Sequence, residues 1–167
     1  MRSGVRRPKT KATSNTITET RTFVTFNSSG FNTTEVKEYF INPDNFGDDL
    51  VKWLMQELLS RNIEVDPELG QEDHGWYFTF QCGGQSYDFI VGHQGGEGEK
   101  WLGWLERGAG FLPSLFGARK RGIKPEAAQS IHVILASSPR IQNIRWHLSK
   151  DFDAGNEESA TAEPTMV

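Results

Sequence analysis

Two short segments of the chain alternate between apolar and polar residues with the period of a β-strand, and a Gly-Gly pair separates them. The first segment, residues 76–82, places Trp76, Phe78 and Phe80 on one face, and the second, residues 85–92, alternates in the same way. A two-residue glycine turn favours the primed turns that suit the twist of a hairpin. The pattern therefore predicts an antiparallel hairpin at the centre of the domain.

A helical period of apolar residues appears on both sides of this hairpin. Large apolar residues recur every fourth position over residues 46–58, which predicts a first helix. We expect Asn45 to cap this helix, with Asp48 as the reciprocal partner of a capping box. Pro125 suits the first turn of a second helix, and Pro139 ends it.

Shorter apolar runs predict the rest of the sheet. Residues 21–27, 101–105 and 141–148 are expected to be strands, and residues 35–41 could form another. Residues 67–73 are expected to be a loop. The order of these elements favours an α+β two-layer sandwich, in which two helices pack on one face of a mainly antiparallel sheet of about five strands.

Charge divides the chain into three parts. The 167 residues suit one domain, and their net charge is -4. Residues 1–22 hold six bases and one acid, whereas residues 151–167 hold five acids and no base. We therefore predict a disordered basic arm over residues 1–20, a single α+β domain over residues 21–150, and a disordered acidic tail over residues 151–167.

The compartment is predicted from what the chain lacks. No apolar run reaches the roughly 20 residues of a membrane helix, and the basic N-terminus has no apolar signal-peptide segment. The single cysteine, Cys82, cannot form an internal disulfide, so nothing favours secretion. Its place on the aromatic face of a strand predicts a small core residue rather than a reactive thiol. We expect a cytoplasmic protein that does not associate with membranes.

Two short motifs resemble a known group of proteins. The sequence FGDDL at residues 46–50 opens the first helix, and EDHGW at residues 72–76 opens the hairpin. This pair is similar to motifs in a group of small uncharacterised bacterial α+β proteins, over roughly residues 42–148. The resemblance implies a bacterial origin and supports the domain boundaries, and it attaches no function to any residue.

One glycine-rich loop carries residues that could bind a metal ion. His93 with Glu97 and Glu99 could supply nitrogen and oxygen ligands, and the acid-rich segment 72–74 could assist a metal-dependent hydrolase. The alternative is that these are solvated turns, with Asp73 capping local amides. No phosphate loop, nucleophile elbow or Cys/His pair is present. We therefore favour a protein that is not an enzyme, and we expect no cofactor.

The segment 111–124 joins an apolar patch to the densest basic cluster of the domain. We predict that a protein partner contacts the apolar side chains Phe111, Leu112, Leu115 and Phe116. The basic residues precede a predicted helix start, where an anion could bind; they are Arg119, Lys120, Arg121 and Lys124. The alternatives are that the apolar residues belong to the core and that the basic residues form a solvated loop.

A pair of tryptophans offers a second candidate surface. Trp101 and Trp104 are three residues apart in a strand, so their side chains face opposite sides of the sheet. One of them must lie off the helix-covered face, where it could be a binding platform unless the N-terminal strand or residues 108–118 cover it.

These features favour a non-enzymatic protein-binding domain, most concretely an immunity-type or defence-associated protein. The alternatives are the metal-assisted hydrolase at His93, Glu97 and Glu99, and nucleic-acid binding through the basic arm. The acidic charge of the remaining chain makes the nucleic-acid alternative less favoured.

Overall fold

A computed structural model describes residues 19–96, 98–108 and 122–167 of the chain. The strands are β1 (Phe23–Asn27), β2 (Val65–Glu72), β3 (Gly75–Cys82), β4 (Gln85–Gly95), β5 (Lys100–Arg107) and β6 (Gln142–His147). The helices are α1 (Asp48–Ser60), α2 (Pro125–Ser137), the short α3 (Ser149–Asp153) and the 3-10 turn η1 (Glu157–Ser159).

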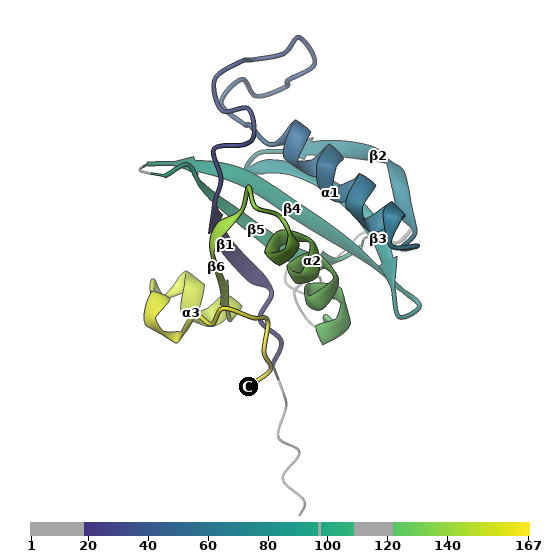
Figure 1. The fold of residues 1–167 in the computed structure, drawn as a ribbon, viewed down its shortest axis with the longest axis vertical. Coiled ribbons are helices and arrows are strands. Elements are labelled where there is room, and N and C mark those ends of the chain that lie inside the picture. The colour runs from purple at the N-terminus through teal and green to yellow at the C-terminus, as the bar shows by residue number, and fades with distance from the viewer. Residues whose placement is uncertain (1–18, 97, 109–121) are drawn as a thin grey trace, which may run out of the picture.

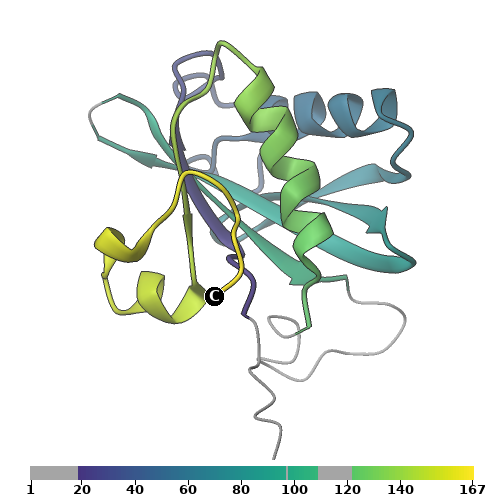
Figure 2. The ribbon, with the colours of Figure 1, turned by 60° about the horizontal axis from the view of Figure 1, so that its bottom comes forward.

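The six strands form one antiparallel sheet in the order β2-β3-β4-β5-β1-β6. Helices α1 and α2 lie over the same face of this sheet (Figure 1). On the opposite face, called the open face below, the described part of the chain places α3 beside β6 (Figure 2). The predicted α+β class and mainly antiparallel sheet are confirmed, and the sheet has one strand more than the five expected.

The central hairpin has the predicted register. β3 pairs with β4 from Trp76 opposite Val91 to Cys82 opposite Gln85. Gly83 and Gly84 both have positive φ, at 57° and 75°, as a primed two-residue turn requires.

The core lies between the helices and the aromatic face of the sheet. On the sheet side it contains fully buried aromatic residues, which include Phe26, Phe78, Phe89, Trp101 and Trp146. On the helix side it contains aliphatic residues, which include Leu50, Leu54 and Leu58 of α1 and Ile131 and Leu135 of α2. Burial of this much apolar area is the dominant favourable contribution to folding.

The predicted capping box at the start of α1 is wrong. Gly47, with φ of 134°, occupies the position before the first helical residue, and no side chain caps the helix there. The amide of Asn45 instead donates to the carbonyl oxygens of Glu72 and Asp73, at 2.9 and 3.0 Å. Asn45 lies two residues too far from the helix to reach its free amides, and it fastens the β2–β3 turn.

Two segments differ from the predicted strands and loops. Residues 35–41 form turns, not a strand, whereas residues 65–72 form edge strand β2 instead of a loop. The pairing of β2 with β3 shifts register between Val65 and Leu69. An edge strand with such an irregularity tolerates Pro67, which could not donate a hydrogen bond in a central strand.

The C-terminal segment makes regular contacts with the domain, whereas we predicted a disordered tail over residues 151–167. Thr161 pairs with Trp146 through backbone hydrogen bonds of 2.7 and 2.9 Å. Val167 exchanges backbone hydrogen bonds with Glu19. Phe152 stacks on Phe23, with 5.0 Å between ring centroids. These few contacts hold an acidic segment whose composition alone favours disorder.

Candidate functional site

Trp101 and Trp104 point to opposite faces of β5, as their spacing predicts. Trp101 is fully buried among core residues, and its indole nitrogen donates to the carbonyl oxygen of Ser28 at 3.0 Å. Trp104 lies on the open face, where its ring stacks with that of Phe23 at a centroid distance of 6.1 Å. Strand β1 pairs edge to edge with β5, so it lies beside Trp104 in the sheet and does not cover it.

A hollow of about 430 Å³ lies on the open face around Trp104. The apolar part of its lining, called its floor below, consists of Phe23, Leu102 and Trp104. The polar part of its lining, called its rim below, consists of Glu72 and His74 near the β2–β3 turn, Gln94 of β4, Glu106 of β5 and Asp153 of α3. We call this feature the open-face hollow.

Close backbone packing places the β2–β3 turn beside this hollow. A Cβ atom at Gly75 would lie 2.3 Å from the carbonyl oxygen of Val91, and one at Gly92 would lie 2.3 Å from that of His74. Only glycine at both positions lets β3 and β4 approach so closely. The hydrogen bonds from Asn45 hold the same turn from the other side, and together they fix Glu72 and His74 at the rim.

Helix α3 supplies the opposite part of the rim. The Phe152 ring stacks on Phe23 and meets His147 edge-on, at 5.0 and 5.5 Å between centroids. His147 is buried, and its Nε2 lies 2.9 Å from Thr25 Oγ1. Burial lowers the pKa of His147, because the charged imidazolium is poorly solvated there. These contacts anchor α3 and so position Asp153.

The described residues that line the open-face hollow include three acids and one histidine. None of the described residues that line it is lysine or arginine. The Trp104 indole N–H donates to Glu106 Oε1 at 3.2 Å, which orients the ring. The face of the Trp104 ring and its apolar neighbours can therefore pack against the apolar atoms of a ligand.

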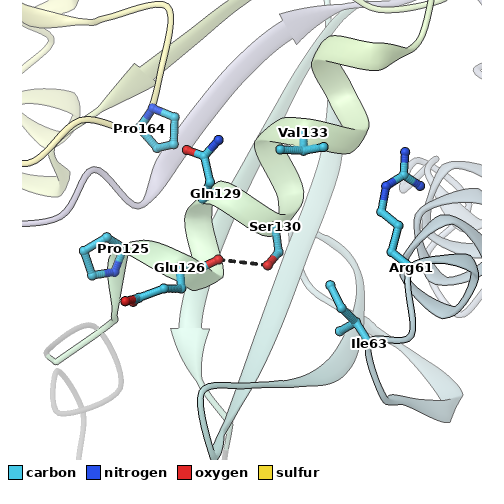
Figure 3. A pocket seen from close by; sticks show the side chains of 8 residues that line it. All are labelled: Arg61, Ile63, Pro125, Glu126, Gln129, Ser130, Val133 and Pro164. Atoms are coloured by element: carbon cyan, nitrogen blue, oxygen red, sulfur yellow. Dashed lines mark hydrogen bonds between the residues drawn. The ribbon is translucent and has the colours of Figure 1, made fainter.

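A second hollow lies between the two long helices (Figure 3). Its volume is about 550 Å³, and its lining consists of Arg61, Ile63, Pro125, Glu126, Gln129, Ser130, Val133 and Pro164. Its charged side chains are one base, Arg61, and one acid, Glu126. Their charges are opposite, so the net charge of the described lining favours neither a cation nor an anion. Cys82 is half-buried next to it, with its Sγ 3.9 Å from Ser130 Oγ. The cysteine therefore packs at the edge of the core rather than inside it.

The FGDDL motif has a structural role at the start of α1. Asp48 is fully buried, and its Oδ2 accepts hydrogen bonds from Lys37 Nζ at 2.8 Å, Lys52 Nζ at 3.3 Å and the Tyr39 hydroxyl. Asp49 accepts a hydrogen bond from the backbone amide of Asn32 at 2.8 Å. Both carboxylates therefore bind the preceding irregular segment to α1.

The pKa values at Asp48 follow from these contacts. Burial raises the pKa of Asp48, but hydrogen bonds from Lys37 and Tyr39 outweigh it, so the pKa falls below its usual range. The hydrogen bond to Asp48 raises the pKa of Lys37. A carboxylate that is ionised and paired in this way acts as a structural ion, which binds the segment before α1 to the helix.

The residues proposed as metal ligands are only partly brought together. His93 Nε2 lies 2.6 Å from Glu99 Oε2, and the imidazole packs against Trp101 and Phe46, at centroid distances of 5.0 and 6.4 Å. Glu97 lies outside the described residues. Within the ranges that the structure covers, no group of three His, Cys, Asp or Glu side chains could hold a metal ion.

Most of the predicted partner surface lies outside the described part of the chain. This applies to Phe111, Leu112, Leu115, Phe116, Arg119, Lys120 and Arg121. Lys124 is described, and it precedes the first residue of α2. Its Nζ donates to the carbonyl oxygen of Gly83 at 3.0 Å, so it fastens the central hairpin turn to α2.

Sequence reasoning found Trp104 but missed the hollow around it. The lining comes from residues 23, 72, 74, 94, 102, 104, 106 and 153, which only the sheet order and the docking of α3 bring together. The available signal was the open-face position of Trp104 and Glu106 on one strand.

None of the known protein families, curated proteins or solved structures compared with this chain matches it. Among the described residues, no helix has the length and apolar composition needed to cross a membrane.

Proposed function

We propose that this protein is a non-enzymatic domain that binds a protein partner on the open face of its sheet. The observation that carries this proposal is the open-face hollow, whose lining contains the half-buried Trp104 beside Phe23 and Leu102. Tryptophan is enriched among the residues that dominate binding energy at protein interfaces, where it packs against apolar atoms and still offers a polar edge.

The surroundings of Trp104 suit recognition of a partner. The sheet beneath it is rigid, because β5 pairs on both sides, with β4 and β1. The floor is apolar and the rim is polar, which is the usual arrangement of a protein interface. A preformed surface of this kind loses little conformational entropy on binding, so more of the contact energy appears as affinity.

An immunity-type or defence-associated role is the more specific form of this proposal. It is supported by the small size of the chain, its acidic net charge and its broad antiparallel sheet. A basic toxin or nuclease would be a suitable partner for such a surface, because complementary charge speeds encounter and selects the partner.

The test compares two variants of the full chain in complex formation with a partner recovered from the native host. Trp104→Ala should remove the floor of the open-face hollow and weaken the complex by roughly thirtyfold or more, as for an interface hot spot. Leu59→Ala is the matched control, because Leu59 is an exposed apolar residue of α1 on the helix side.

Hydrogen exchange on the complex gives the second measurement. Binding of the partner should slow amide exchange in β1, in β5 and in the β2–β3 turn. The proposal would be overturned if the folded Trp104→Ala variant bound the partner as well as the wild type, or if protection were confined to α1 and α2. Melting temperatures of both variants show whether each remains folded.

A further inference from the structure

We propose that His132 is a pH-sensitive switch, which holds the C-terminal segment of residues 160–167 on the domain while its imidazole is neutral and loosens this segment when it is protonated. The observation that carries this proposal is a hydrogen bond of 3.2 Å from Trp146 Nε1 to His132 Nδ1. The bond joins β6 to α2 on the helix-covered side of the sheet, so the proposed function of the open face does not depend on it.

The direction of this hydrogen bond fixes the protonation state of His132. An indole nitrogen carries a hydrogen and can only donate, so His132 Nδ1 must accept with a lone pair. The neutral imidazole then carries its hydrogen on Nε2. In the imidazolium form both ring nitrogens carry hydrogens, so two N–H groups would face each other and the bond would be lost. The link between β6 and α2 therefore requires a neutral His132.

The burial of Trp146 makes this loss costly for the closed arrangement. Its side chain is fully buried, and its ring meets the His132 ring edge-on, with 6.3 Å between centroids. An indole N–H that is buried without an acceptor is destabilising, because its hydrogen bond to water is not replaced. Protonation of His132 therefore favours a state in which Trp146 has moved away from α2.

Trp146 also carries the pairing of the C-terminal segment. Its backbone N–H and carbonyl exchange hydrogen bonds with Thr161, at 2.7 and 2.9 Å, in an isolated bridge outside the named strands. The exchange between Val167 and Glu19 lies at the far end of the segment, so it can persist while the residues next to Thr161 loosen. A displacement of Trp146 is thus transmitted directly to Thr161.

The charged groups around His132 lie on the segment that would move. From the C-terminal segment, the negative charge of Glu163 acts on the imidazole. On β6, Arg145 and His147 flank Trp146 directly, so their side chains point to the opposite face of the strand. On α2, the residues one turn away from His132 are uncharged, and they are Ala128, Gln129, Leu135 and Ala136. A protonated His132 would therefore lose Trp146 and be attracted toward Glu163.

The pKa of His132 agrees with this geometry. Burial lowers the pKa of His132, and the charge of Glu163 offsets part of that effect. A histidine that is exposed to water takes up its proton near pH ~6.5. Because the closed state binds this proton less readily than the loosened state, acidification below that pH favours the loosened state. The closed state keeps its full advantage above it.

The experiment measures amide exchange of the full-length protein by NMR at about pH 7.5 and about pH 5. After correction for the chemical exchange rate, the protection of the Thr161 and Trp146 amides should fall by roughly tenfold at the lower pH. The amides that pair β3 with β4 should keep their protection. The nitrogen shifts of His132 should show the hydrogen on Nε2 at the higher pH, and the loss of protection should follow the titration of His132 with the same midpoint.

Two variants separate His132 from the other titrating groups. His132→Asn places an amide oxygen close to the position of Nδ1, where it can accept from Trp146 but takes up no proton in this range. This variant should keep the Thr161 amide protected at both pH values. His74→Asn is the matched control, because His74 is exposed and lies at the β2–β3 turn, and it should lose protection as the wild type does.

Three results would overturn the proposal. The first is a hydrogen on His132 Nδ1 at the higher pH, and the second is equal protection of Thr161 at both pH values. The third is a His132→Asn variant that loses protection on acidification as the wild type does, which would assign the effect to the buried His147 or to a carboxylate. The first two are measured on the wild type, so they decide the case even if His132→Asn is too unstable to study.

Discussion

Lys37 Nζ lies 2.8 Å from Asp48 Oδ2, and this ion pair binds the irregular segment before α1 to the first turn of that helix. Asp48 is fully buried, whereas the Lys37 side chain is about 30% exposed. Lys52 and Tyr39 contact the same carboxylate oxygen. A single buried acid thus gathers three partners, and it replaces the missing side-chain cap as the feature that organises this end of α1.

Replacing Asp48 with asparagine should destabilise the fold. The two lysines would lose their ionic partner, and hydrogen bonds to charged groups contribute more than neutral ones, so we expect a loss of about 2 kcal/mol in the free energy of unfolding. Urea denaturation followed by circular dichroism measures it. Asp44→Asn is the control, because Asp44 is exposed. Equal stability of the two variants would show that the ion pair contributes nothing.

Stability should also depend on pH through Asp48. Its pKa in the folded protein is lowered, so the unfolded chain takes up the proton first as the solution is acidified. The contribution of Asp48 is therefore present above its ordinary pKa and is lost as pH falls through the folded value. Denaturation between about pH 6 and about pH 2 should show a shallower decline for Asp48→Asn than for the wild type. Parallel declines would contradict this assignment.

Gly103 allows an aromatic ring to pack against the backbone of β5. A Cβ atom at this position would lie 2.4 Å from Cζ of Phe89, a fully buried core residue. Gly103→Ala should therefore force Phe89 out of place and cost about 1–3 kcal/mol in the free energy of unfolding. At Gly30 the new atom would meet only the flexible Arg140 side chain, so Gly30→Ala should be much milder. A Gly103→Ala variant as stable as Gly30→Ala would refute the close packing.

Phe152 should link the C-terminal segment to the open-face hollow. Its ring holds α3 against Phe23 and His147, and Asp153 follows it directly. Phe152→Ala should speed amide exchange in α3 by roughly tenfold, a local loss of about 1.4 kcal/mol, with little effect on β3 and β4. Lys150→Ala, which removes only an exposed ion pair with Glu19, should leave exchange nearly unchanged. Unchanged exchange in Phe152→Ala would show that other contacts hold α3.

The sequence by itself determined the elements whose signal is local. The Gly83-Gly84 turn between alternating strands identified the hairpin, the four-residue period identified α1, and Pro125 marked the start of α2. The spacing of Trp101 and Trp104 placed them on opposite faces. These features follow from the periods of strand and helix, which depend only on neighbouring residues.

Only the tertiary structure decided what depends on contacts between distant residues. Asn45 is a residue type that often caps helices, but its amide donates to the β2–β3 turn instead. Asp48 pairs with Lys37, which lies in a segment whose sequence has no helical or strand period. Composition predicts disorder for the acidic C-terminal segment, yet stacking of Phe152 on Phe23 outweighs it. The open-face hollow needs the order β4-β5-β1 and the docking of α3 before its lining residues meet. Long-range pairing of this kind is absent from any short window of sequence, because it is set by the free energy of the whole fold and not by local propensity.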